Sequence, residues 1–314
     1  MDDKRNPEVV QRLTQWIENY NSQQEDNKGG QEEAAKRTGY TSGAISQYLG
    51  NKYSADPKNI EKKILAFLQT DDEAKGVYEP PEYVDTSISS AVYKTLRYIH
   101  LTSKFTIECG DAGIGKTKAA EKYVKDYPSN SILITMNPCF AETKKPFLKT
   151  LCRALEISSS AGCDDMWIAC LNKLSRKTLL IIDEAQEMSR ETINVIRHMW
   201  DAGKWSFGVV LIGNHLIVDK IRDDKSKKYD QLNNRIGKFP ERFTKDIITE
   251  DIVKLFPAIK DDKKAVRFLL EVARSREGVR GAVNIFSFAH DNGNITYDGI
   301  IAAAKMRQLE LRYH

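Results

Sequence analysis

The segment that most constrains the fold lies at residues 110–117 and follows the pattern G-x-x-x-x-G-K-[ST]. Its residues are Gly110, Asp111, Ala112, Gly113, Ile114, Gly115, Lys116 and Thr117. An apolar strand pattern at 105–109 leads into it, and a helical pattern at 117–124 leads out. Glycines let the backbone wrap around an anion with its N–H groups pointing inward, and a helix start adds positive partial charge. The segment therefore predicts a phosphate-binding loop between a strand and a helix.

Two side chains of this loop indicate which phosphate compound binds there. Lys116 is placed to reach the β- and γ-phosphates of a nucleotide, and the hydroxyl of Thr117 to bind Mg²⁺. We therefore expect residues 110–117 to bind ATP together with Mg²⁺. The alternative, a chance glycine-rich turn, is disfavoured by the strand and helix patterns on either side.

Polar side chains also follow two later strand patterns, at 179–182 and 209–212. Asp183 is predicted to hold Mg²⁺ through water, and Glu184 to orient or activate the attacking water. Asn214, after the next strand, is predicted to hydrogen-bond the γ-phosphate or its water. The alternatives are a solvated strand end for the two carboxylates and a turn-forming asparagine at the later position.

Strand and helix patterns alternate through the middle of the chain, which predicts a parallel sheet flanked by helices. The strand patterns lie at 105–109, 132–136, 179–182 and 209–212. We assign this α/β ATPase domain to residues 84–246 and a C-terminal helical lid to 247–314. Residues 1–70 show only helical spacing, and the acidic segment 71–83, with two adjacent prolines, predicts a linker.

The N-terminal module is predicted to be an all-α helix-turn-helix domain, with helices at 32–36 and 41–49 and a turn at Gly39. Its expected core residues are Ala35, Ile45 and Leu49. Side chains expected to be exposed and able to contact DNA are Thr41, Ser42, Ala44, Gln47, Tyr48, Asn51 and Lys52. Residues 1–80 carry 11 basic and 14 acidic residues, so a helical protein-interaction module remains the alternative.

Charge, cysteine content and hydropathy limit which other classes of protein we expect. The whole chain has a net charge of +4, and its larger, later part is mildly basic, which is compatible with nucleic acid without demanding it. The five cysteines lack C-x-x-C spacing, so reduced thiols are expected rather than a zinc site or disulfides. No apolar run is long enough to span a membrane and the first residues do not resemble a signal peptide, so a cytoplasmic protein is expected.

The order of these motifs is similar to that of the AAA+ ATPases. Within them the chain resembles the B-type target-capture ATPases of Mu-like transposing phages and, more distantly, the ATPase subunits of related transposons. The segments that carry this resemblance lie at 109–117, 181–185, 210–215 and 234–238, with 42–46 and 51–53 in the N-terminal module.

The resemblance implies roles for further residues. Arg235 falls where the family places an arginine finger that reaches the nucleotide of a neighbouring subunit. In the lid, Asn284 stands where an arginine is expected, and Arg280 is the candidate substitute. The family also binds DNA through loops of the ATPase domain, which makes Lys144, Lys145 and Lys204 candidates, with solvated lysines as the alternative.

The implied function is an ATP-dependent protein that oligomerises as a filament on double-stranded DNA, largely without sequence preference. It would select target DNA and activate a DDE-type transposase in the cytoplasm of a bacterial host, with slow hydrolysis controlling disassembly. The rival interpretation is a regulatory ATPase whose helix-turn-helix reads one operator.

Overall fold

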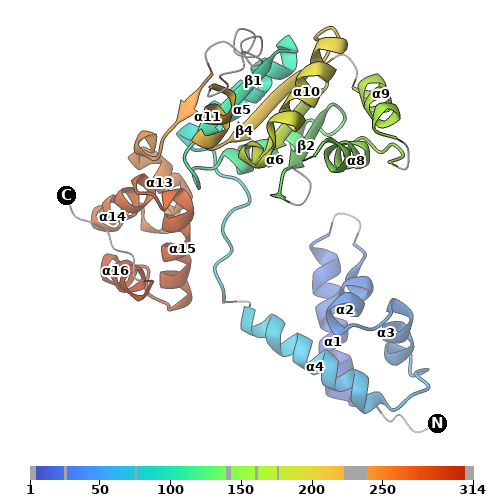
Figure 1. The fold of residues 1–314 in the computed structure, drawn as a ribbon. Coiled ribbons are helices and arrows are strands. Elements are labelled where there is room, and N and C mark those ends of the chain that lie inside the picture. Colours follow the sequence, from blue (N-terminus) through green and yellow to red (C-terminus); the bar gives the residue numbers. More distant parts are fainter. Residues whose placement is uncertain are drawn as a thin grey trace. The chain divides into compact units, whose positions relative to one another are not determined.

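The computed structural model describes residues 5–24, 27–74, 76–138, 143–159, 162–174, 177–222 and 239–307. The chain divides into two compact units, Met1–Tyr78 and Glu79–His314 (Figure 1), and each is described by itself. Among the described residues, no helix has both the length and the apolar character that a membrane span requires. Four of the five cysteines are described, and all four are free thiols.

The first unit is built from helices that share one apolar core. The helices are α1 (Pro7–Ser22), α2 (Gly30–Thr38), α3 (Ser42–Leu49) and α4 (Pro57–Ala74). Gly39 ends α2 in the left-handed conformation with φ 72°, and the hydroxyl of Thr41 caps α3 by accepting from the N–H of Ala44. Apolar side chains at helical spacing on all of these helices fill the core, including Leu13, Ala35, Ile45 and Ile64.

Tyr48 corrects one expectation, because its side chain is 0% exposed rather than available to DNA. It lies one helical turn after buried Ile45, so both residues face the core. Its hydroxyl donates to Oε1 of Glu61 on α4 at 3.0 Å, which satisfies the polar end of a buried ring. The spacing from Ile45 could have revealed this.

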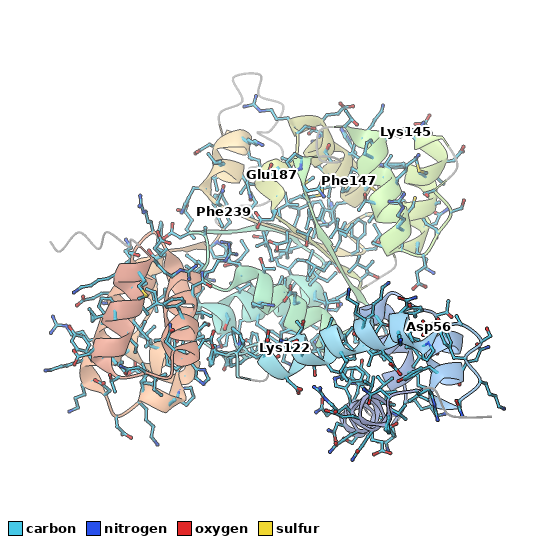
Figure 2. All side chains as sticks on the ribbon, turned by 90° about the horizontal axis from the view of Figure 1, so that it is seen from below. Asp56, Lys122, Lys145, Phe147, Glu187 and Phe239 are labelled. Atoms are coloured by element: carbon cyan, nitrogen blue, oxygen red, sulfur yellow. The ribbon has the colours of Figure 1, made fainter. Side chains whose placement is uncertain are left out.

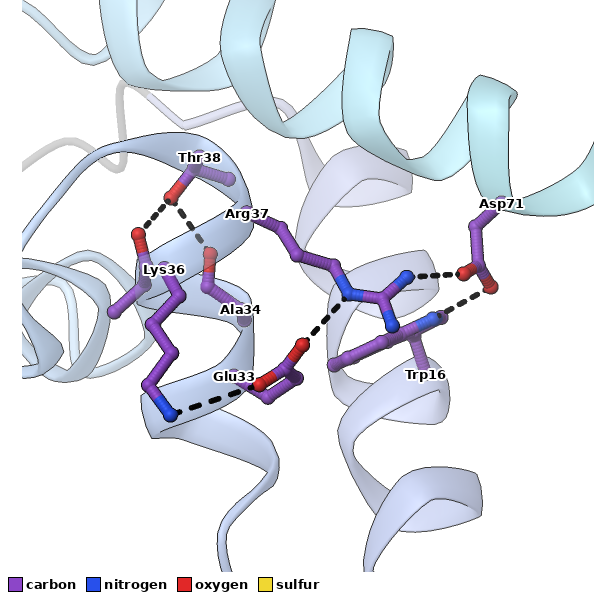
Figure 3. Close-up of polar contacts among 8 residues, drawn as sticks. Trp16, Glu33, Ala34, Lys36, Arg37, Thr38 and Asp71 are labelled. Carbon is purple, nitrogen blue, oxygen red and sulfur yellow. Dashed lines mark hydrogen bonds and ion pairs between the residues drawn. The ribbon is translucent and has the colours of Figure 1, made fainter. Parts of the chain in front are cut away.

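The last turn of α4 continues past residue 70, where the sequence places the end of the module. Asp71 accepts hydrogen bonds from the indole of Trp16 at 2.7 Å and from Arg37 at 2.8 Å (Figure 3). The guanidinium of Arg37 also bonds Glu33, and Arg12 pairs with Asp72 at 2.8 Å. These contacts hold the first residues of the predicted linker in the helical unit.

The second unit contains a parallel sheet with the strand order β2-β3-β4-β1-β5. The strands are β1 (Phe105–Gly110), β2 (Ser131–Thr135), β3 (Leu179–Asp183), β4 (Gly208–Gly213) and β5 (Glu241–Arg242). Every residue of β1, β3 and β4 is buried, so both faces of the sheet are covered. The predicted α/β fold class is confirmed.

Helices cover this sheet and extend the unit into a separate helical group (Figure 1). The covering helices are α5 (Ser87–Thr102), α6 (Lys116–Asp126), α8 (Lys144–Ala154), α9 (Cys163–Lys173), α10 (Arg190–Ala202) and α11 (His215–Arg222). The helical group at the C-terminal end consists of α13 (Thr249–Leu255), α14 (Lys263–Arg274), α15 (Gly278–Asp291) and α16 (Tyr297–Met306). Helix α5 was not predicted, although its apolar residues Val92, Leu96 and Ile99 have helical spacing.

Strand β5, which is only two residues long and pairs with the end of β1, was not predicted either. Its Arg242 donates from Nε to Oε1 of Glu108 at 2.8 Å, and Glu108 is 0% exposed. Burial raises the pKa of the Glu108 carboxyl, while the guanidinium acts in the opposite direction. This ion pair fixes the edge of the sheet beside the glycine-rich loop.

Candidate nucleotide site

The glycine-rich loop connects β1 to α6 at the carboxyl end of the sheet. Gly113 and Gly115 have φ angles of 72° and 98°, which side-chain-bearing residues rarely adopt. Gly110 is required for space, because a Cβ there would lie 2.5 Å from the carbonyl oxygen of Arg242. The loop backbone thus depends on the glycines of the motif, and α6 starts directly after it at Lys116.

Lys116 turns back over the loop from the first turn of α6. Its Nζ donates to the carbonyl oxygens of Gly110 at 3.0 Å and Asp111 at 2.6 Å. Burial lowers the pKa of this ammonium, and the nearby carboxylates of Asp183 and Glu184 partly offset the effect. A partly desolvated ammonium beside a glycine-rich loop at the start of a helix is suited to bind a phosphate.

Thr117 and Asp183 meet across the sheet edge. The hydroxyl of Thr117 donates to Oδ2 of Asp183 at 2.7 Å, and Asp183 is 2% exposed. Burial raises the pKa of the Asp183 carboxyl, against the hydrogen bond from Thr117. One hydroxyl and one carboxylate fit Mg²⁺, which takes one or two protein oxygens and completes its shell with water and phosphate.

Glu184 begins the turn after β3 in the left-handed conformation, with φ 53°. Its side chain is exposed, and Oε2 accepts a hydrogen bond from the amide of Gln186. The other end of that amide, Oε1, accepts from the backbone N–H of Asn214 at 3.3 Å. Gln186 therefore connects Glu184 and Asn214, although no sequence pattern predicted a role for it.

The side chain of Asn214 is used locally. Its Oδ1 accepts from the N–H of Leu216 at 2.9 Å at the start of α11, which is the turn-forming behaviour that the sequence left open. Asn214 stands at the carboxyl end of β4, next to β3 in the sheet. A bond from this side chain to the γ-phosphate stays a prediction.

Asp111 ties the glycine-rich loop to its neighbours. Its Oδ2 accepts from the N–H of Thr244 at 2.7 Å, and Oδ1 lies 3.4 Å from Nε2 of His215. The imidazole of His215 also stacks on Phe243, with ring centroids 5.3 Å apart. Asp111 thus holds the loop against the start of α11 and the segment after β5.

The C-terminal helical group contacts the loop through backbone. Gly278, with φ 65°, begins α15, and a Cβ there would lie 2.7 Å from the carbonyl oxygen of Ala112. The N–H of Arg280 donates to the carbonyl oxygen of Gly113 at 3.2 Å. The side chains of Arg280 and Asn284 are exposed. The structure therefore places Arg280 beside the loop, whereas Arg235 lies outside the described residues.

The candidate DNA-contacting residues occupy both units. Thr41, Gln47 and Lys52 are exposed in or next to α3, and Ser42 is half-buried. Lys204 is exposed between α10 and β4 with φ 49°. Lys144 and Lys145, expected on a loop, instead form the first turn of α8. Lys145 lies on the outer side of that helix, and Phe147 points to the core (Figure 2).

Residues 99–221 match the family described as AAA domain. Together with the parallel sheet and the glycine-rich loop, this match defines the second unit as an ATPase of the AAA class.

Two relatives indicate which kind of AAA ATPase this chain resembles. The Mu-like prophage FluMu DNA transposition protein B of Haemophilus influenzae is 25% identical over 256 residues, which cover 80% of this chain and 88% of that protein. The ATP-dependent target DNA activator B of Escherichia phage Mu is 26% identical over 207 residues, which cover 65% of this chain and 65% of that protein, just under two thirds of its length. The predicted resemblance to Mu-like B proteins is confirmed.

A solved structure supports the fold alone. The crystal structure of Cdc6p from Pyrobaculum aerophilum aligns with a TM-score of 0.51 and 12% identity over 73% of this chain and 69% of that chain.

Proposed function

We propose that the chain is an ATP-dependent DNA-binding protein that acts on target DNA in transposition. The observation that carries the proposal is the similarity to two transposition proteins, one of them an ATP-dependent target DNA activator. The likeness covers most of the chain and includes an AAA domain whose glycine-rich loop, Lys116, Thr117 and Asp183 meet in one site.

In this proposal ATP binds to residues 110–117 with Lys116 at the β- and γ-phosphates. Thr117 and Asp183 hold Mg²⁺, directly or through water, and the bound metal would neutralise charge on the phosphates. Glu184 orients the attacking water, and Asn214 hydrogen-bonds the γ-phosphate or that water. Each group stands at the carboxyl end of a parallel strand, the edge at which open α/β sheets bind ligands.

In this proposal the two units have different roles. The second unit holds the nucleotide residues, with 84–246 as the ATPase domain and 247–314 as a lid whose Arg280 binds nucleotide. Arg235 acts on the nucleotide of a neighbouring copy, so that ATP binding promotes assembly of a filament on DNA. The assembled protein activates a DDE-type transposase. The helical unit adds DNA contacts through Thr41, Ser42, Gln47 and Lys52.

Helix α8 supports a DNA-contacting role for the ATPase domain. Lys144 and Lys145 lie at the amino end of this helix, where positive side chains oppose the helix dipole and lower its stability. The helix has no acidic residue, and Lys145, Lys149 and Arg153 lie on one of its faces at four-residue spacing. Lys144 and Lys145, which do not stabilise the helix at its amino end, are suited to contact phosphates, and Lys204 is a further candidate.

Binding to a pool of random duplexes with ATP present tests this proposal. Contacts to phosphates predict little sequence preference and an affinity that falls linearly on a log–log salt plot. The double variant Lys144→Ala, Lys145→Ala should lower that slope by about one unit for each phosphate that the lysines no longer neutralise. The control is Lys122→Ala with Lys125→Ala, a half-buried and an exposed α6 lysine that already pair with Asp126 and Glu82.

One enriched motif bound several orders of magnitude more tightly than random DNA would instead favour the regulatory ATPase that reads an operator. In that case Gln47→Ala, on the exposed side of α3, should relax the preference at one base position, with a cost of about 1–3 kcal/mol. The absence of any ATP-dependent DNA binding would reject both functions.

A further inference from the structure

Gln186 is almost enclosed, with 7% of its surface exposed, and both ends of its carboxamide are engaged. Its oxygen accepts from the backbone N–H of Asn214 at 3.3 Å. A backbone N–H can only donate, so the amide oxygen must face β4 and the NH₂ group must face Glu184. The hydrogen bond from Asn214 at the end of β4 therefore determines that Gln186 presents its NH₂ group, a donor, to Glu184.

The surroundings of Gln186 are shaped for this arrangement. A Cβ at Gly213 would lie 2.8 Å from Oε1 of Gln186, so only glycine leaves the carboxamide its place beside the strand. Lys220 on α11 donates from Nζ to the carbonyl oxygens of Gln186 and Met188, and thereby closes the turn after β3. Residues of β4, of α11 and of the junction between them thus position one amide.

Glu184 needs such support because its own backbone does not provide it. A glutamate in the left-handed conformation is strained, and its side chain is exposed. The amide of Gln186 engages Oε2 and leaves Oε1 to accept from another donor. The Glu184 charge also acts on Lys116, which places the carboxylate within electrostatic reach of the phosphate-binding loop.

We propose that Gln186 is a positioning residue for ATP hydrolysis, which holds the Glu184 carboxylate in register with the end of β4. This inference rests on the proposed role of Glu184 in orienting the attacking water. Because one amide connects Glu184 with Asn214, a displacement at the end of β4 is passed to the carboxylate by a hydrogen bond rather than by contact with nucleotide.

The test is a double-mutant cycle on ATP hydrolysis by the full chain, under the same DNA and Mg²⁺ conditions throughout. Gln186→Met keeps the length of the side chain and removes the amide. We expect kcat to fall roughly tenfold to a hundredfold, the loss typical of a hydrogen bond to a charged group, with KM for ATP unchanged. In a Glu184→Gln background the same substitution should have almost no further effect, because Gln186 acts only through Glu184.

Gly213→Ala provides a second variant that leaves Gln186 in place. The added methyl group presses on Oε1, so we expect kcat to fall in the same direction, again without a change in KM. Folding of each variant is checked by thermal unfolding. Equal losses of kcat in the wild-type and Glu184→Gln backgrounds would overturn the positioning role, as would a rise in KM at constant kcat. A Glu184→Gln protein that hydrolyses at the wild-type rate would instead reject the role of Glu184, and the inference with it.

Discussion

Charged groups in the nucleotide site and in the helical unit occupy opposite environments. Asp183 is buried and Lys116 is half-buried, and burial shifts both pKa values toward the neutral forms. In the helical unit, Arg12 and Arg37 pair with Asp72 and Asp71 at the surface, where water and salt screen the attraction. Buried charges cost folding free energy, so their presence at the glycine-rich loop indicates a ligand, whereas the surface pairs add modestly to stability.

The largest effect is expected from Lys116→Ala, which removes the half-buried ammonium of the site. ATP affinity should fall by at least about a hundredfold, because the variant cannot form charge-assisted bonds to two phosphate groups. Equilibrium titration with a fluorescent ATP analogue measures this. The control is Lys118→Ala, since Lys118 is exposed on the same helix and pairs with Glu121. Normal ATP binding by the Lys116 variant would show that the site is assigned wrongly.

The second effect concerns stability at the sheet edge. Arg242→Ala removes the guanidinium that pairs with Oε1 of the buried Glu108 carboxylate, whose Oε2 has no hydrogen-bond partner among the described residues. We expect the second unit to lose about 3 kcal/mol or more of its free energy of unfolding in urea. Arg267→Ala, which breaks an exposed pair with Glu271, should cost less than about 0.5 kcal/mol. Similar losses for the two variants would contradict the contrast between buried and exposed pairs.

A third effect tests the backbone contact between α15 and the loop. Gly278→Ala introduces a Cβ against the carbonyl oxygen of Ala112, so we expect nucleotide affinity to fall about tenfold, equivalent to about 1.4 kcal/mol. Gly293→Ala is a matched control, because Gly293 also has a positive φ of 71° but nothing lies within 4 Å of its added Cβ. Equal effects of both variants on nucleotide binding would mean that strain in the helical group, rather than the contact, is responsible.

The smallest effect is expected in the polar cluster of the helical unit. Arg37→Ala removes the bonds to Glu33 and Asp71 and the stacking on Trp16, and should destabilise the first unit by about 1 kcal/mol. The loss should shrink at 1 M salt, where exposed ion pairs are screened. A loss of several kcal/mol of unfolding free energy that does not depend on salt would mean that this cluster behaves like the buried charges. Thermal unfolding at two salt concentrations measures the difference.

The sequence predicted the parts of the site whose residues are neighbours along the chain. The glycine-rich loop, the strand before it and the helix after it are local features, and so is the Asp183-Glu184 pair at the end of an apolar strand. The parallel sheet followed from alternating strand and helix patterns. The short β5 was missed because two residues are too few to show a period.

Where the sequence was incomplete or wrong, the outcome depended on a partner far along the chain. Tyr48 was placed on an exposed face, but the first unit buries it and α4 supplies Glu61 for its hydroxyl. Asp71 was assigned to a linker, but Trp16 and Arg37 hold it in the helical unit.

The residue types and local periodicity of this chain therefore determined its ATPase class and the position of its phosphate-binding loop. Tertiary structure alone decided that Gln186 bridges Glu184 and the end of β4, and that Gly278 packs closely against the backbone of the phosphate-binding loop. The reason is physical. A helix, a strand or a glycine turn is encoded by neighbouring residues, whereas a hydrogen bond or a close backbone contact between distant segments exists only after packing has brought them together.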